Sequence, residues 1–368
     1  MRIAIAGGGT GGHISPAIAV AESLRSLDPA ADIHFLGTPR PVDARMYAPF
    51  GETFHVLHPP RVEKGPAGLF LLPVRSLASY REALTLLRRL RPDVLFGTGG
   101  YPSFFPVLAS RTLGIPSAIH ESNGVPGKAN LLASLVATLV LTGSATASEA
   151  FRVPVRLTGN PVRHSLRPMD RISARLSLGL PEEGITVLFL GGSQGAHALN
   201  AMVPLAPAGI SVVVQCGASD EERVRLSCKG MHGTEVRVVG FTDDPSTLYS
   251  AADVAVARAG AMTIAELAWF RLPSVLVPYP SAAGDHQRIN AEEAAAGGGA
   301  VVLAQDRLEE DLWDLVSGLA ADAEGLAGRR EALARTMPSN PADAVAALLL
   351  DLARGASVGR RGRGGPDA

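Results

Sequence analysis

Short apolar runs rich in β-branched residues alternate with helix-length segments along almost the whole chain. In the first half, seven runs read as strands: residues 2–6, 32–36, 54–57, 94–97, 117–120, 139–141 and 155–158. The helical periodicity between them predicts helices over residues 14–27, 77–90, 103–113 and 128–137. Near-continuous apolar strands separated by helices are typical of a parallel sheet that is covered on both faces.

The same alternation starts again in the second half. Six further strands are predicted over residues 186–190, 211–216, 235–239, 254–257, 274–277 and 300–303. Between the two series lies a break at residues 159–163, followed by a polar stretch to residue 181. We therefore expect an α/β protein with two doubly wound, Rossmann-like domains, residues 1–163 and 164–340, facing each other across a cleft.

The C-terminal part of the chain predicts three more helices, at residues 308–320, 323–335 and about 341–354. Pro341 suits the first turn of the last one, and we expect that helix to pack back on the first domain. Residues 355–368 contain five Gly and three Arg, and we expect a disordered tail.

Charge and cysteine content narrow the class of protein. The 368 residues carry a net charge of −1, which predicts no nucleic-acid partner. Two cysteines exclude a disulfide framework and favour a reducing compartment. No apolar run approaches the ~20 residues of a membrane span, and the apolar start is too short for a signal peptide. We expect a cytoplasmic protein whose first 163 residues (16 Lys+Arg, 10 Asp+Glu) are basic and whose remainder (18 and 25) is acidic.

A glycine-rich loop, Gly7-Gly8-Gly9-Thr10-Gly11-Gly12, follows the first strand and precedes a helix. Such a loop lets backbone N–H groups and a helix N-terminus approach an anionic or polar ligand. A dinucleotide site would need a carboxylate at the end of the second strand, and residues 35–38 offer none. His13, placed at the helix start, is a candidate general base, because the helix dipole disfavours its cation; the alternative is a histidine that only caps the turn.

A second glycine loop, residues 97–103, follows the fourth strand, and residues 120–127 follow the fifth. Both lie at strand carboxyl ends, so we expect them to share a site with His13. Glu121 could orient His13 or contact a sugar hydroxyl, or it could be an ordinary polar loop residue.

The second half carries two comparable loops. Residues 191–195 lack the Lys-Ser/Thr ending of a P-loop, but they offer N–H groups and the Ser193 hydroxyl to a diphosphate. Residues 259–266 repeat the arrangement. Glu266 could accept hydrogen bonds from both hydroxyls of a ribose, or it could be a plain carboxylate near a helix start.

The sequence shows no metal-ligand spacing, so helix N-termini and arginine would neutralise a diphosphate. We expect no cofactor and no protein-held metal; Mg²⁺ could accompany the diphosphate.

Together these segments resemble the MurG family of bacterial glycosyltransferases. Seven segments match in family order: residues 7–16, 96–103, 120–130, 159–163, 191–196, 260–266 and 285–291. The resemblance implies a GT-B fold and inverting transfer of N-acetylglucosamine (GlcNAc) from UDP-GlcNAc to the C4 hydroxyl of lipid I (undecaprenyl-pyrophosphoryl-MurNAc-pentapeptide), giving lipid II and UDP for peptidoglycan synthesis.

The resemblance also implies roles for individual residues. His13 would be the base, with Glu121 as a secondary candidate. Four residues would lie around GlcNAc and the acceptor: Thr10, Gly11, Gly12 and Asn123. The donor would be held by Arg163, Ser193, Thr242, Ala261, Met262, Thr263, Ile264, Ala265, Glu266 and Gln287. Within that set Thr242 would read uracil through its backbone, Ser193 would contact phosphate, and Glu266 would hold the ribose.

Since lipid I is membrane-embedded, the resemblance also implies peripheral attachment to the cytoplasmic face of an anionic membrane. Residues 65–75 are an apolar candidate for the membrane-contacting surface, within the basic segment 61–91, which carries seven cations and two anions. An ordinary buried helix is the alternative.

Two other functions stay open at this point. One is a GT-B-like UDP-GlcNAc 2-epimerase, and the other is a non-catalytic nucleotide-sugar-binding scaffold at the membrane.

Overall fold

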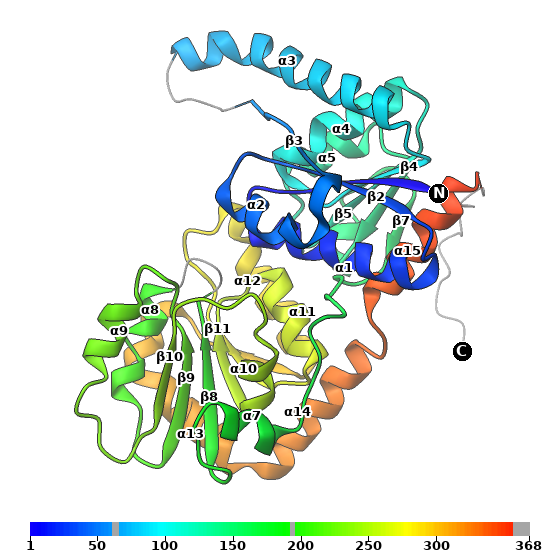
Figure 1. The fold of residues 1–368 in the computed structure, drawn as a ribbon. Coiled ribbons are helices and arrows are strands. Elements are labelled where there is room, and N and C mark those ends of the chain that lie inside the picture. Colours follow the sequence, from blue (N-terminus) through cyan, green and yellow to red (C-terminus); the bar gives the residue numbers. More distant parts are fainter. Residues whose placement is uncertain (61–65, 192–195, 356–368) are drawn as a thin grey trace. The chain divides into compact units, whose positions relative to one another are not determined.

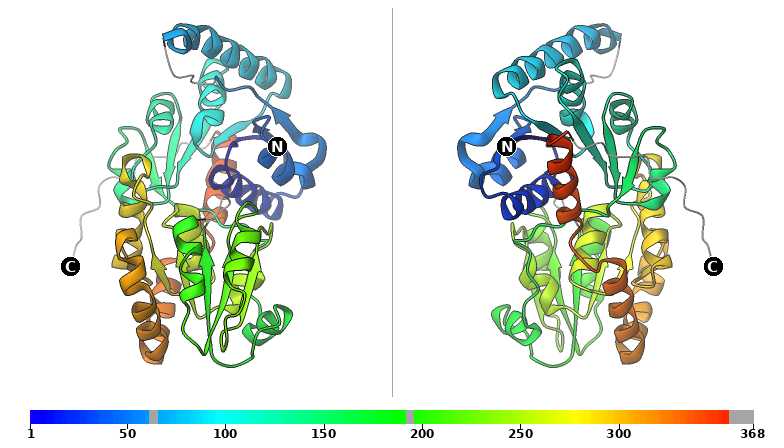
Figure 2. Two further views of the ribbon diagram at one scale, coloured as in Figure 1. Left: turned by 90° about the vertical axis from the view of Figure 1, so that its left-hand side faces the viewer. Right: turned by 90° about the vertical axis from the view of Figure 1, so that its right-hand side faces the viewer.

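The computed structural model describes residues 1–60, 66–191 and 196–355. Two compact units form: unit 1 comprises Met1–Ser122, Pro126–Pro161 and the chain from Pro341, and unit 2 comprises Asn123–Val125 and Val162–Asn340. The chain passes from unit 1 to unit 2 at residue 162, whereas the sequence placed the change at residue 164. In each unit, helices cover a twisted parallel sheet (Figure 1; Figure 2).

The sheet of unit 1 has seven parallel strands in the order β3-β2-β1-β4-β5-β6-β7. Their bounds are β1 Arg2–Ala6, β2 Asp32–Gly37, β3 Phe54–Val56, β4 Val94–Gly97, β5 Ser117–Glu121, β6 Leu139–Thr142 and β7 Val155–Leu157. The order reverses between β1 and β4, which are neighbours. In open α/β sheets ligands bind beyond the carboxyl ends of the strands at such a reversal, so the loops that follow β1 and β4 are the place to look for a site.

Seven α-helices and one 3₁₀ helix of unit 1 are described. They are α1 Gly11–Leu27, α2 Pro41–Tyr47, η1 Ala48–Thr53, α3 Pro66–Leu90, α4 Gly100–Thr112, α5 Lys128–Ser134, α6 Ala145–Ser148 and α15 Pro341–Ala353. The last helix lies against α1 (Figure 1). Its Val345, Ala346 and Leu349 belong to the same buried cluster as the strand residues Ile3 and Ile5.

Unit 2 has six parallel strands in the order β10-β9-β8-β11-β12-β13. Their bounds are β8 Ile185–Leu190, β9 Ile210–Gln215, β10 Val236–Val239, β11 Val254–Ala257, β12 Ser274–Leu276 and β13 Ala300–Val302. The α-helices are α7 Arg171–Ser177, α8 His197–Asn200, α9 Glu221–Ser227, α10 Ser246–Ala251, α11 Ala261–Trp269, α12 His286–Ala296, α13 Leu308–Ala321 and α14 Ala323–Thr336. Short 3₁₀ helices are η2 Val203–Leu205, η3 Ala283–Asp285 and η4 Gln305–Arg307. Here the strand order reverses between β8 and β11, and the loops that follow these two strands are the corresponding place for a ligand.

All thirteen strands expected from the sequence are present within two residues of their expected ends. Helix α3 is the largest departure, because it begins at Pro66 rather than near residue 77 and includes Pro73. Its apolar residues face outward: Phe70 is 82% exposed and Val74 66%. The buried-helix alternative is therefore wrong for this part of α3. No helix among the described residues is long and apolar enough to span a membrane.

An ion pair is buried in unit 2, between helix α7 and the start of β11. The Arg175 guanidinium donates to Asp253, and the two side chains are 2% and 4% exposed. Arg171 also donates to this carboxylate at 2.6 Å, as does the backbone N–H of Thr186 at 2.9 Å. Removing one partner from such a pair leaves an uncompensated buried charge, which costs far more than breaking an exposed pair.

We expect Asp253→Asn to lower the free energy of unfolding by about 3–5 kcal/mol, because it leaves the buried guanidinium of Arg175 without a compensating negative charge. The matched control is Asp311→Asn, which breaks the exposed pair with Arg307, where the side chains are 38% and 54% exposed. This control should cost less than about 1 kcal/mol. Urea denaturation of both variants measures the difference, and equal losses would show that Asp253 is not a structural anchor.

Candidate active site

The first glycine loop is held in place by buried side chains of α2. The Asp43 carboxylate, fully buried, accepts from the backbone N–H of Gly9 at 2.9 Å and of Thr38 at 2.8 Å. The Tyr47 hydroxyl donates to the carbonyl of Gly7 at 2.8 Å. The sequence did not identify Asp43, since an acidic residue in the first turn of a helix has no distinguishing signal. Its contacts fix the loop that leads into α1.

The N-terminus of α1 is open to a ligand. Thr10 occupies the N-cap in extended conformation but its side chain caps no N–H group, and the first turn contains no acidic residue. Apart from Gly11, its chain neighbours and the backbone of its own helix, no heavy atom of the described residues lies within 4 Å of where a Cβ of Gly11 would be. The first N–H groups of the helix and its dipole are thus available to an anionic or polar group. The contacts that the resemblance implies for Thr10, Gly11 and Gly12 stay predictions.

His13 lies in the first turn of α1 and is bound twice by Thr98, which follows β4. Its ring Nδ1 is 3.0 Å from the Thr98 carbonyl oxygen, and the Thr98 hydroxyl donates to the His13 carbonyl at 2.7 Å. Because a carbonyl can only accept, Nδ1 carries the proton in the neutral ring. The lone pair is then on Nε2, the arrangement that a general base requires.

The second glycine loop gives Nε2 its space. Gly99 and Gly100 have backbone φ angles of +94° and +73°, which residues other than glycine rarely adopt. A Cβ at Gly100 would lie 3.0 Å from His13 Nε2. Glycine is therefore needed here for its conformation and for its missing side chain.

Burial lowers the pKa of His13, while the hydrogen bond with Thr98 and the charge of Glu121 act in the opposite direction. The position of His13 at a helix start predicts such a shift from the helix dipole, but the main cause in the structure is desolvation. The imidazole is therefore neutral near pH 7, and it remains partly exposed.

Glu121 lies at the end of β5 with 3% of its surface exposed. Its Oε2 accepts from the backbone N–H of Gly127 at 2.9 Å and from Asn130 Nδ2 at 2.8 Å. Asn130 also donates to the carbonyl of His120. The carboxylate is thus fixed by its own loop, and it acts on His13 through its charge. Its role as a secondary base stays a prediction.

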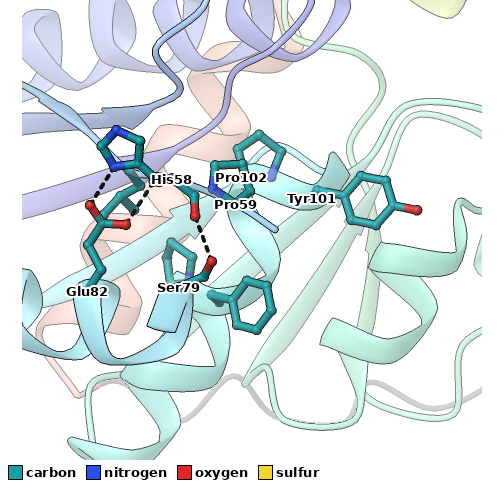
Figure 3. A pocket seen from close by; sticks show the side chains of 9 residues that line it. His58, Pro59, Ser79, Glu82, Tyr101 and Pro102 are labelled. Atoms are coloured by element: carbon teal, nitrogen blue, oxygen red, sulfur yellow. Dashed lines mark hydrogen bonds and ion pairs between the residues drawn. The ribbon is translucent and has the colours of Figure 1, made fainter. Parts of the chain in front are cut away.

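A pocket that the sequence did not predict opens beside the second glycine loop (Figure 3). His58 donates its backbone N–H to Glu82, and its ring Nδ1 lies 2.8 Å from the other oxygen of that carboxylate. The Ser79 hydroxyl donates to the His58 carbonyl at 2.6 Å. Tyr101 and Pro102, which follow Gly100, line the same pocket. These polar groups are paired with each other, so the contacts fasten the segment after β3 to α3.

In unit 2, Glu266 lies in the second turn of α11 and is partly exposed. Its Oε2 accepts a hydrogen bond of 2.7 Å from the hydroxyl of Tyr249, a residue of α10 that the sequence did not identify. Burial raises the pKa of Glu266, and both this hydrogen bond and the charge of Arg163 oppose the rise. The structure thus brings together Glu266 and Arg163, two of the predicted donor-binding residues.

Arg163 also reaches the loop that contains Thr242. Its Nη2 donates to the carbonyl of Asp243 at 3.0 Å. The Thr242 hydroxyl is occupied within its own turn, because it donates to the Asp244 carbonyl at 2.9 Å. The same hydroxyl also accepts from the backbone N–H of Asp244 at 3.2 Å. The backbone reading of uracil that the resemblance implies for Thr242 stays a prediction.

The first turns of α11 contain the predicted contacts Ala261, Met262, Thr263, Ile264 and Ala265. The side chains of Ala261, Met262 and Ala265 are buried. The N-cap residue, Gly260, provides no side-chain cap, and the first turn has no acidic residue. A ligand at this end of α11 would therefore meet backbone N–H groups more than side chains.

Asn123 and Gln287 occupy the region around α12. Asn290 joins three segments of unit 2: its Oδ1 accepts from the Gly124 N–H at 2.9 Å, and its Nδ2 donates to Asn123 Oδ1 and to the Ala259 carbonyl, both at 3.2 Å. Gln287 accepts from the backbone N–H of Tyr279 at 2.9 Å, which leaves its side-chain NH₂ as a donor.

Ser193, the predicted phosphate contact, lies outside the described residues. Among the residues that the structure describes, no group of three or more His, Cys, Asp or Glu side chains is arranged to hold a metal ion.

The chain matches two domains of one enzyme family. Residues 3–142 match the glycosyltransferase family 28 N-terminal domain, and residues 186–340 match its C-terminal domain. A UDP-N-acetylglucosamine–N-acetylmuramyl-(pentapeptide) pyrophosphoryl-undecaprenol N-acetylglucosamine transferase of Desulforudis audaxviator is 37% identical, over 90% of this chain and 93% of the relative. The transferase of the same name from a Mycobacterium species is 36% identical over 98% of both chains.

Solved structures agree with this relationship. The crystal structure of Acinetobacter baumannii MurG superposes with a TM-score of 0.76 and 27% identity, covering 95% of this chain and 99% of that one. A UDP-GlcNAc 2-epimerase from Neisseria meningitidis gives a TM-score of 0.64 at 13% identity, covering 96% of this chain and all of that one. At that identity the likeness concerns the fold alone.

We expect His13 to titrate below its ordinary value of 6.5, because burial disfavours the imidazolium. Glu121→Gln should lower the pKa of His13 further, since it removes a negative charge that favours the cation. Glu149→Gln, at an exposed carboxylate of unit 1, is the matched control and should leave this titration unchanged. NMR of the ring nitrogens measures all three, and a His13 pKa above 6.5 would contradict the assignment.

Proposed function

The chain belongs to the family of UDP-N-acetylglucosamine–N-acetylmuramyl-(pentapeptide) pyrophosphoryl-undecaprenol N-acetylglucosamine transferases, the MurG family, and on this premise we propose that it transfers GlcNAc from UDP-GlcNAc to the C4 hydroxyl of the MurNAc of lipid I. The products are lipid II and UDP. The observation that carries the proposal is the neutral imidazole of His13, which lies beside two glycine loops at the N-terminus of α1. Its Nε2 has no hydrogen-bond partner among the described residues.

Unit 1 provides the groups that activate the acceptor. The C4 oxygen attacks C1 of GlcNAc, its proton passes to Nε2 of His13, and the bond between C1 and the UDP oxygen breaks with its electron pair on UDP. Proton removal by such a base accelerates a transfer by about 10²–10⁴-fold. Attack on the face opposite the leaving group inverts the anomeric centre. Thr98 keeps the ring in the tautomer that this step needs.

Unit 2 provides the groups that hold the donor. Glu266 accepts from the ribose hydroxyls, and the backbone at Thr242 contacts uracil. Arg163 acts on Glu266 through its charge and donates to the Asp243 carbonyl, next to Thr242. The uncapped N-terminus of α11 supplies N–H dipoles for the developing charge on the diphosphate. Gln287 and Asn123 donate and accept toward hydroxyl-rich parts of the substrates.

The test is an assay of UDP release from UDP-GlcNAc with a lipid I analogue. We expect His13→Ala to lower kcat by about 10²–10⁴-fold, while the Kd for UDP-GlcNAc changes by less than about threefold, since the donor residues lie in unit 2. In the unaltered enzyme the rate should fall as pH is lowered through the pKa of His13, below 6.5, because the imidazolium cannot accept a proton.

His232→Ala, at an exposed histidine of unit 2, is the control and should retain full turnover. Equal loss of turnover and donor affinity in His13→Ala would make His13 a binding or structural residue. Release of UDP only in the presence of acceptor supports transfer. Epimerised sugar without acceptor would indicate a 2-epimerase, and donor binding without product would indicate a non-catalytic scaffold.

We also propose that the outward face of α3 attaches unit 1 to an anionic membrane, where lipid I resides. Phe70, Leu71, Val74 and Leu77 are 41–82% exposed and recur at helical spacing. Helix α4 packs between α3 and α5, and α5 exposes Leu132, followed by Leu135. Apolar insertion together with the basic charge of the first 163 residues would give reversible attachment at the cytoplasmic face.

We expect Phe70→Asp to reduce the fraction of protein that floats with anionic liposomes several-fold, because a carboxylate replaces an 82% exposed phenyl ring. The matched control is Ile172→Asp, at a 46% exposed residue of α7 in unit 2. It should float like the unaltered protein. Unchanged flotation of Phe70→Asp would exclude α3 as the membrane surface.

A further inference from the structure

The hydroxyl of Tyr249 is buried against the carboxylate of Glu266, and we propose that Tyr249 is the positioning residue that aims Glu266 at the two hydroxyls of the donor's ribose. This inference rests on the proposed function and deepens it. It assigns selectivity for a ribonucleotide donor over a 2′-deoxyribonucleotide donor to a residue that itself need not touch the substrate.

The geometry leaves the Tyr249 hydroxyl little freedom. The residue is 4% exposed, and its ring stacks on that of Phe270, with centroids 4.8 Å apart and an angle of 24° between the planes. From this fixed ring the hydroxyl donates to Glu266 Oε2 at 2.7 Å. A short hydrogen bond from an immobilised donor fixes the plane of the carboxylate as well as its position.

The carboxylate of Glu266 can accept further hydrogen bonds beside the one from Tyr249. Burial, followed by the charge of Glu266, raises the pKa of Tyr249 well above its usual range, so the phenol stays protonated and donates. An ionised carboxylate has about four lone-pair sites, and Tyr249 occupies one. The partly exposed remainder can accept from two vicinal hydroxyls, whose spacing matches that of two carboxylate oxygens.

The same hydrogen bond keeps Glu266 in the form that accepts. Burial favours the neutral acid, which carries a proton on one oxygen and can accept from fewer hydroxyls. The Tyr249 hydroxyl and the charge of Arg163 both act against this protonation. Loss of the hydroxyl would therefore weaken ribose recognition through orientation and through charge, with no change to the groups that act on the acceptor.

Packing alone does not require a tyrosine at this position. Phenylalanine would keep the stack on Phe270 and fill the same volume except for one oxygen, whose described partner is Glu266. Tyr249→Phe is thus a conservative variant that removes the proposed action and retains the fold. The variant Tyr80→Phe is a matched control, because it removes a hydroxyl bonded to Thr112 in unit 1.

The experiment measures turnover with UDP-GlcNAc and with its 2′-deoxy analogue. In Tyr249→Phe we expect the KM for UDP-GlcNAc to rise about tenfold, the loss of one charge-assisted hydrogen bond, with kcat within about threefold. The preference for UDP-GlcNAc over the 2′-deoxy donor should fall by a similar factor. Tyr80→Phe should change neither quantity.

Two further measurements separate positioning from general damage. In a Glu266→Gln background, adding Tyr249→Phe should raise the donor KM by less than about twofold, because the hydroxyl acts through Glu266. Calorimetry should show that Tyr249→Phe weakens binding of UDP much more than binding of 2′-deoxy-UDP.

The outcomes are distinguishable. Equal weakening of both nucleotides, or of neither, would overturn the role of Tyr249, whether or not the enzyme turns over. Selective weakening of UDP in a protein without acceptor-dependent UDP release would support the positioning role and overturn the proposed function. If Tyr249→Phe unfolds, Glu266→Gln serves in the same comparison, and an unchanged preference for UDP over 2′-deoxy-UDP in it would overturn the inference.

Discussion

The two hydrogen bonds between Thr98 and His13 connect the loops that follow β1 and β4, and the geometry of unit 1 around the candidate base depends on them. They form because the strand order reverses between β1 and β4, which puts both carboxyl ends side by side. The contact is so close that a Cβ at Gly7 would lie 2.0 Å from the Thr98 hydroxyl oxygen. Glycine at residue 7 thus brings the loops together, and glycine at residue 100 leaves room beside Nε2.

Much of the fold could be predicted from the sequence because a buried parallel strand is apolar on both faces, and such runs stand out in a chain with polar loops. The start of α3 could not be predicted, since Pro66, Gly68 and Pro73 are residue types typical of a loop. Their helical conformation in α3 is a property of the folded chain that no local start signal announces.

Some residues of the candidate site could likewise be predicted from the sequence, and others could not. Glycine loops after strands can be found by pattern, and so His13 and Glu266 were identified. Asp43, Tyr249 and Asn290 could not be, because each acts through a partner distant in sequence: Asp43 is 34 residues from Gly9, and Asn290 is 166 residues from Gly124. Nothing local distinguishes an aspartate that anchors a glycine loop from one that begins a helix. Their roles become apparent only once the partners are in place.

Desolvation shifts the pKa of both His13 and Glu266 toward the neutral form, but the surroundings of the two groups differ. At His13 burial prevails over the opposing charge of Glu121, and the resulting neutral imidazole is the form that can take a proton. At Glu266 the same effect would favour a neutral acid, a poorer acceptor for two hydroxyls. A donor hydroxyl and a cation are found at Glu266, opposing the shift. With the proposed roles, burial alone favours the neutral form of a base that gains a proton, whereas a carboxylate that stays ionised is favoured by a hydrogen-bond donor and a cation. This difference would account for Tyr249 and Arg163 beside Glu266.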